Sequence, residues 1–77
     1  MDNKGLKKLL ETAVNSLESF EYWQDKFYNS NEQDKTAYDL ADAQYTNFIC
    51  LVNAYNIVTG KRIAKTKFSL QRELKTL

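Results

Sequence analysis

The sequence predicts an all-α protein: a long antiparallel helical hairpin with a short third, C-terminal helix, as a monomer or a homodimer. Three observations predict this fold. Apolar residues recur at steps of three and four over two long stretches. No proline interrupts either stretch. A cluster of turn formers, Asn29 to Asn31, separates the two, so the helices fold back on each other within one domain, residues 1–77.

The first helix is predicted over about residues 4–29. Asp2 or Asn3 supplies a side chain that can cap its first turn. The helix is amphipathic, and its apolar stripe comprises Leu6, Leu9, Leu10, Ala13, Leu17, Phe20, Trp23 and Phe27.

The second helix is predicted over about residues 31–59. Ser30 and Gln33 have the spacing of a capping box at its start, and Asn29 suits a left-handed position at the end of the first helix. One face of the helix carries Tyr38, Ala41, Tyr45, Phe48, Val52 and Tyr55. From Phe48 onward almost no polar face remains, which predicts that this half is covered on more than one side. Cys50 lies there and is expected to be a small buried side chain.

Gly60 is a natural end for the second helix, because glycine tolerates the left-handed backbone. A short third helix is predicted over about residues 67–76, with Thr66 or Ser69 as its cap. Leu70, Leu74 and Leu77 share one of its faces. We expect this face to cover the apolar second half of the second helix.

The composition narrows the classes of function. The chain has no histidine, two isolated glycines and a single cysteine. It therefore lacks the commonest acid–base group and metal ligand, and it cannot form a glycine-rich phosphate loop. The sequence predicts no enzyme activity, no cofactor and no metal site. No apolar run approaches the ~20 residues of a membrane span. The first residues do not resemble a signal peptide, so a cytoplasmic protein with no membrane partner is expected.

Charge is strongly separated along the chain, although the net charge is only +1. Residues 9–59 carry two lysines against eight acids, a net −6, whereas residues 60–77 carry six basic groups against one acid, a net +5. Folding the hairpin brings the basic residues of both ends of the chain together. The sequence therefore predicts a basic end at the termini and an acidic, aromatic-rich end at the turn.

The turn end is the first candidate for a binding surface. Its aromatic side chains either form local core or contact a partner, and its acids favour a basic surface on that partner. The candidate protein-binding residues are Tyr22, Trp23, Asp25, Tyr28, Glu32, Asp34, Tyr38 and Asp39. The expected function is non-enzymatic: a small regulatory or inhibitory module that binds a larger protein or complex. Accessory proteins of mobile elements offer an analogy for such chains, at the level of architecture only.

The basic end supports an alternative, a small nucleic-acid-binding protein. Lysine and arginine attract phosphates, although basic residues at helix ends also serve solubility alone. The candidate nucleic-acid-binding residues are Lys4, Lys7, Lys8, Lys61, Arg62, Lys65, Lys67, Arg72 and Lys75.

Overall fold

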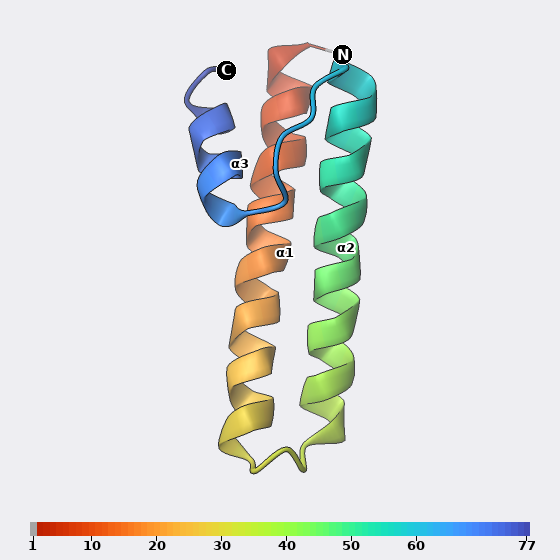
Figure 1. Ribbon diagram of the computed structural model, residues 1–77, viewed down its shortest axis with the longest axis vertical. Coiled ribbons are helices and arrows are strands. Elements are labelled where there is room, and N and C mark those ends of the chain that lie inside the picture. Colours follow the sequence, from red (N-terminus) through yellow and green to blue (C-terminus); the bar gives the residue numbers. More distant parts are fainter. Residues whose placement is uncertain (1) are drawn as a thin grey trace.

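The computed structural model describes residues 2–77 and contains three helices and no strand in that range. Helix α1 spans Asn3–Asn29, α2 spans Lys35–Thr59 and α3 spans Lys67–Leu74. α1 and α2 form an antiparallel hairpin, and α3 lies beside α1 in the half of the rod that ends with the termini (Figure 1). The rod measures 43 × 19 × 18 Å. The predicted all-α hairpin with a short C-terminal helix is therefore confirmed.

The core lies in the half of the rod where three helices meet. Its fully buried cluster comprises Leu10, Ala13 and Val14 of α1, Phe48, Val52 and Tyr55 of α2, and Leu70 of α3. Nearer the turn, α2 buries only the small side chains of Ala37 and Ala41. The two-helix half of the rod is thus thinly packed, because no third layer covers it.

The start of α2 differs from the prediction. α2 begins at Lys35, and its cap is Asp34, whose carboxylate accepts a hydrogen bond of 3.0 Å from the Ala37 N–H. The prediction that a Ser30–Gln33 capping box starts α2 is wrong. The Ser30 hydroxyl does accept from the Gln33 N–H, as in a capping box, but it also accepts from the Asp34 N–H, and both bonds lie within the turn. The backbone N–H of Ser30 donates to carbonyls of the last turn of α1.

The left-handed residues of this turn are also not where the spacing placed them. Asn31 and Glu32 have φ values of 58° and 61°, whereas Asn29 remains helical. Two consecutive left-handed residues reverse the chain in a few residues, and they leave no helical backbone before Asp34. The helix predicted from residue 31 therefore starts four residues later.

The other predicted helix boundaries hold closely. The Asp2 carboxylate caps α1 by accepting from the Gly5 N–H at 2.8 Å, and the Thr66 hydroxyl caps α3 by accepting from the Ser69 N–H at 3.1 Å. α2 ends at Thr59 and is followed by Gly60 as its cap, which has a φ of 71°. α3 ends at Leu74 rather than 76, because the following residues form tighter turns with bonds between residues three apart.

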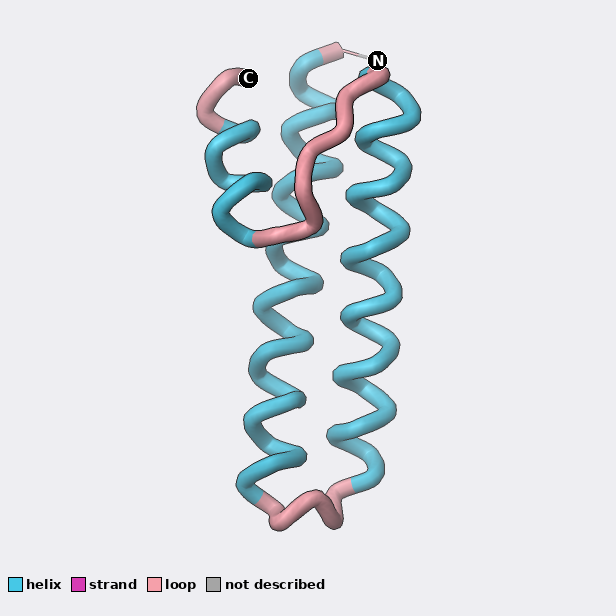
Figure 2. Tube along the Cα trace, viewed as in Figure 1, coloured by secondary structure: helices cyan, strands magenta, loops and turns pink. Residues whose placement is uncertain are grey.

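The loop after α2 returns along the hairpin before α3 begins (Figure 2). The Asn56 side chain holds it at one point. Its Oδ1 accepts from the Ile63 N–H at 3.1 Å, and its Nδ2 donates to the Ile63 carbonyl at 3.3 Å. The loop therefore lies in the space beside α2 that the third helix was expected to fill.

The backbone of α3 packs against α1 and not α2. The prediction that α3 covers α2 is therefore wrong for the helix as a whole and right only for the Leu70 side chain. The Cα atoms of α3 approach those of α1 within 8 Å but none of those of α2. Leu70 points into the core, and Lys67 Nζ lies 3.7 Å from Glu18 Oε1 of α1. α3 reaches α2 through side chains: Leu70 is buried in one cluster with Phe48, Val52 and Tyr55, and the Tyr55 hydroxyl donates to Glu73.

The outer face of α2 consequently stays open. Cys50 is exposed, and the side chains of Ile57 and Val58 are 81% and 54% exposed. The prediction that Cys50 is buried is wrong. The predicted cover on more than one side comes from α1, from the loop at Asn56 and from Leu70, but it does not extend to this outer face. Apolar residues on all sides of a helix do not show whether another segment of the same chain covers each side.

Because Cys50 is exposed, its thiol is expected to react readily in the folded protein. The thiol of the native protein should react with a water-soluble thiol reagent at a rate within a few-fold of that in the urea-unfolded chain, because no folded segment shields it. Stopped-flow absorbance of the released chromophore measures both rates. A native thiol that reacts only when urea unfolds the protein would show that α2 is covered at this position.

Candidate protein-binding groove

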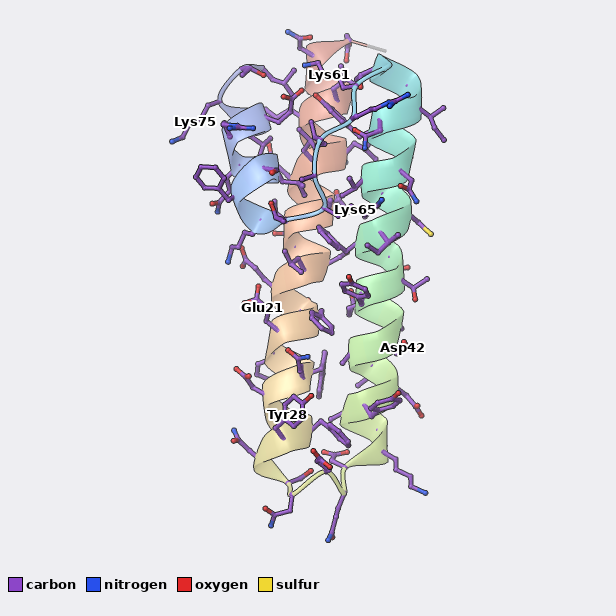
Figure 3. All side chains as sticks on the ribbon, in the orientation of Figure 1. Glu21, Tyr28, Asp42, Lys61, Lys65 and Lys75 are labelled. Atoms are coloured by element: carbon purple, nitrogen blue, oxygen red, sulfur yellow. The ribbon has the colours of Figure 1, made fainter. Side chains whose placement is uncertain are left out.

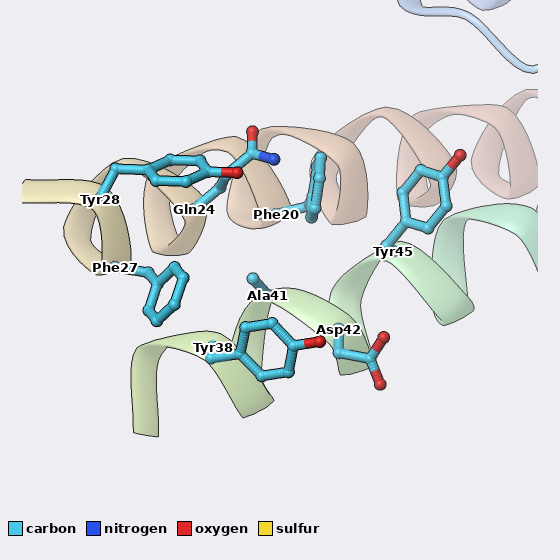
Figure 4. A pocket seen from close by; sticks show the side chains of 8 residues that line it. All are labelled: Phe20, Gln24, Phe27, Tyr28, Tyr38, Ala41, Asp42 and Tyr45. Carbon is cyan, nitrogen blue, oxygen red and sulfur yellow. The ribbon is translucent and has the colours of Figure 1, made fainter. Parts of the chain in front are cut away.

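A groove opens between α1 and α2 in the half of the rod near the turn (Figure 4). Its volume is about 210 Å³. We call it the aromatic groove, and it is lined by Phe20, Gln24, Phe27, Tyr28, Tyr38, Ala41, Asp42 and Tyr45.

The antiparallel register builds the walls of the groove. The rings of Phe20 and Tyr45 lie 4.9 Å apart between centroids, and those of Phe27 and Tyr38 lie 5.2 Å apart. In each pair, the two residues are equally far along the sequence from the midpoint between Glu32 and Gln33, as pairing across an antiparallel hairpin requires. Edge and tilted ring contacts of this kind stabilise the thin half of the hairpin. They use only part of each ring, however, because Tyr38 and Tyr45 remain 56% and 44% exposed.

The groove remains open because the loop and α3 cover only the other half of the hairpin. Asn56, which holds the loop, lies 11 residues from Tyr45 and 18 from Tyr38, whole numbers of helical turns within about 20°. These three residues therefore share one flank of α2. The loop occupies that flank near the termini, and the aromatic groove opens on it near the turn.

The surroundings of the groove are acidic. Residues 20–45 carry six acids against two lysines. Asp42 lines the groove itself, and Glu21 and Asp25 are exposed on α1. Figure 3 shows Glu21, Tyr28 and Asp42 all in the turn half of the rod. The groove thus combines apolar rings and phenol hydroxyls with negative charge.

Of the predicted protein-binding residues, the structure brings Tyr28 and Tyr38 together in the groove. Asp34 is used as the cap of α2. Asp25, Glu32 and Asp39 are exposed near the turn but do not line the groove. The groove residues absent from the predicted set are Phe20, Gln24, Phe27, Ala41, Asp42 and Tyr45.

Tyr22 and Trp23 form a separate cluster outside the groove. Their rings meet edge-to-face at 5.0 Å, and Lys26 Nζ lies 5.6 Å from the centroid of each. Tyr22 is 54% exposed, which is nearly the exposure of Tyr38. The predicted single aromatic surface is therefore two surfaces, and only one of them is concave.

The basic candidates divide in the same way. The start of α1, which carries Lys4, Lys7 and Lys8, lies at the same end of the rod as the end of α2 (Figure 1). Lys61 and Arg62 directly follow α2 in the sequence. Lys65 lies part of the way down the rod, whereas Lys61 and Lys75 lie near its terminal end (Figure 3). The charges therefore extend along α3 and the loop instead of gathering at one end.

Three of the basic candidates already have partners within the chain. Lys61 pairs with Glu73, Lys67 lies 3.7 Å from Glu18, and the Arg72 guanidinium lies 5.6 Å from the ring centroid of Phe68. Lys8 lines a second hollow of about 260 Å³ with Gly5, Leu9, Thr12 and Leu51, which has no aromatic wall.

A polar network joins α2, the loop and α3 beside the core. The Tyr55 hydroxyl donates to Glu73 Oε2 at 2.5 Å, and Lys61 Nζ donates to the same oxygen. Hydrogen bonds from Lys61 and Tyr55 lower the pKa of Glu73 below its ordinary value of 4.5. Burial and the Glu73 carboxylate raise the pKa of Tyr55 to about 12. Both shifts favour the charged carboxylate and the neutral phenol, so the network holds α3 in place.

Within residues 2–77, no group of three or more acidic or cysteine side chains is arranged to hold a metal ion. Nor does any helix of this range have the length and apolar character to cross a membrane. No family model, curated protein or solved structure matches the chain.

Proposed function

We propose that this protein is a non-enzymatic, cytoplasmic interaction module that binds a basic surface of a larger protein or complex and regulates or inhibits it. The aromatic groove is the observation that carries the proposal. Tyrosines that are half exposed around a concave, partly apolar site are typical of residues that dominate binding energy. Such a module would act by occupying its partner's surface, with no chemistry of its own.

Charge supports a basic partner. The groove and its rim lie in a segment with six acids and two lysines. Complementary charge speeds encounter and disfavours acidic surfaces, while buried rings supply the affinity. The partner surface is therefore expected to present lysine or arginine around an apolar side chain.

The test uses a matched pair of variants. Tyr38→Ala removes a groove ring, and Tyr22→Ala removes a ring of nearly equal exposure outside the groove. Affinity capture followed by quantitative mass spectrometry should find a protein that wild type and Tyr22→Ala retain. Tyr38→Ala should lose at least tenfold of it, since a hot-spot ring contributes about 2 kcal/mol or more. A partner retained equally by both variants would contradict the proposal.

Nucleic-acid binding remains the second candidate, because Lys4, Lys7, Lys8 and Arg62 are exposed and have no assigned role within the fold. Fluorescence anisotropy with labelled DNA and RNA at two salt concentrations tests it. Binding through phosphates would fall steeply with added salt and would weaken in a Lys7→Glu, Lys8→Glu variant. Absence of binding at low salt would leave the protein-binding function alone.

A further inference from the structure

Phe68 is the most exposed aromatic side chain among the large exposed hydrophobic residues of 2–77. It lies on α3, is 70% exposed, and carries the Arg72 guanidinium 5.6 Å from its ring centroid. Arg72 and Lys75 follow it at four and seven residues and so share its face. α3 therefore presents an aromatic ring surrounded by positive charge.

The aromatic groove is the complement of this face. It is a concave site of about 210 Å³ with aromatic walls, and Asp42 lies in its lining. Glu21 and Asp25 continue, at steps of three and four residues, the line on α1 that begins with Glu18. Glu18 already accepts Lys67 of the same chain, at 3.7 Å. The acids beyond it lie where a further basic helix would meet them.

One molecule cannot bring its own Phe68 to its own groove. α3 is held in the terminal half of the rod by buried Leu70, by the Lys67–Glu18 pair and by the bond of Glu73 with Tyr55. The groove lies in the other half, near the turn (Figures 1 and 4). Both features therefore stay open in an isolated chain.

We propose that the occupant is a second copy of this chain, which inserts the ring of its Phe68 into the aromatic groove. Two rods placed antiparallel set α3 of each beside the turn half of the other. The contact is then made twice by one two-fold axis, as in an isologous dimer. Arg72 and Lys75 of each copy meet the acids Glu21, Asp25 and Asp42 of the other.

Such a dimer has a consequence for the proposed function. Each groove is covered in the dimer, so a larger partner binds only when it displaces the second copy. This consequence rests on the proposed function, whereas the dimer itself does not. Self-association would then keep an apolar surface out of solvent until the partner is present.

Sedimentation equilibrium of the full chain over a range of concentrations tests the dimer. We expect wild type to interconvert between monomer and dimer, with a dissociation constant that rises at least tenfold between low and high salt. Phe68→Ala should weaken the dimer at least tenfold without changing the helix content. Ile57→Ala is the matched control, because it removes an exposed side chain from the outer face of α2 and should leave the dimer unchanged.

Three outcomes would overturn the inference: a wild type that is monomeric at the highest concentration and lowest salt, a Phe68→Ala variant that dimerises as tightly as wild type, or a dimer lost in Ile57→Ala instead. A mixture of Phe68→Ala and Tyr38→Ala supplies a second measurement. A mixed pair keeps one complete contact, so it should associate more tightly than either variant alone. Equal or weaker association in the mixture would exclude the reciprocal arrangement.

Partner capture by Phe68→Ala separates the two proposals. This variant keeps its groove, so it should capture the partner at least as well as wild type does. Loss of the dimer with capture retained supports both proposals. A dimer that forms as described while no partner depends on Tyr38 would leave the dimer standing and contradict the proposed function alone.

Discussion

Phe48→Ala is expected to leave most of the protein unfolded at 25 °C. Phe48 is only 1% exposed and sits in the one cluster where all three helices meet. Truncating a buried phenylalanine to alanine costs about 3–5 kcal/mol, because transfer free energy is lost and a cavity remains. A single core of this size rarely supplies more than about 3–5 kcal/mol of total stability. The change therefore removes about as much free energy as the fold has.

Urea titration followed by far-ultraviolet circular dichroism measures the effect. Wild type should show a cooperative transition, whereas Phe48→Ala should begin the titration already depleted of helix. Ile57→Ala serves as the control on the same helix. Its side chain is 81% exposed, so the free energy of unfolding should change by no more than about 0.5 kcal/mol. A Phe48→Ala protein within about 1 kcal/mol of wild type would show that the core is not where the fold places it.

The second large effect is expected at Glu73. Glu73→Gln should destabilise the protein by about 1–2 kcal/mol at neutral pH, since a hydrogen bond from Tyr55 to a charged acceptor becomes one to a neutral acceptor. Lys61 is half exposed in its pair with Glu73, so that ion pair contributes less than about 1 kcal/mol. Because the network connects α3 to α2, we expect the variant to loosen the packing of α3, and with it the burial of Leu70, before the hairpin unfolds.

The pH dependence follows from the pKa of Glu73, which is lower in the folded protein than in the unfolded chain. The stabilisation is fully present above pH 4.5 and is lost as the pH falls through the lower, folded value. Free energies of unfolding measured from neutral to acid pH should therefore converge for wild type and Glu73→Gln. Parallel curves, with a constant difference down to the lowest pH, would show that the carboxylate charge does not carry the effect.

Tyr55 adds the opposite dependence at alkaline pH. Its pKa of about 12 exceeds the ordinary 10.0, so the unfolded chain loses this proton first. The contribution is complete below pH 10 and is lost as the pH rises through about 12. The network therefore stabilises the docking of α3 between these acid and alkaline limits.

Local features of the sequence predicted the helices well. Apolar spacing placed α1 and α3, and Asp2, Gly60 and Thr66 ended or capped helices as their chemistry requires. The start of α2 was missed because both Ser30 and Asp34 are good caps, and the left-handed backbone of Asn31 and Glu32 decides between them. A choice between two adequate caps depends on the path of the turn, which neither residue determines alone.

The candidate site was predicted only in part. The sequence indicated an acidic, aromatic end and named Tyr28 and Tyr38, both of which line the groove. Pairing residues about a turn centred between Glu32 and Gln33 would also have placed Phe20 opposite Tyr45. The spacing of residues within each helix does not show that Tyr38 lines the groove and Tyr22 does not. That difference depends on which side chains the opposite helix places beside each tyrosine.

By itself the sequence determined the helices, the hairpin and the separation of charge, since these follow from periodicity, capping and the order of residues in the chain. Only the tertiary structure decided that α3 packs on α1, that the outer face of α2 with Cys50 and Ile57 stays open, and that the aromatic groove is left uncovered. These outcomes depend on contacts between different elements of the fold, such as Asn56 of α2 with Ile63 of the loop and Lys67 of α3 with Glu18 of α1. An apolar face shows that burial is favourable, but it does not specify which segment provides it.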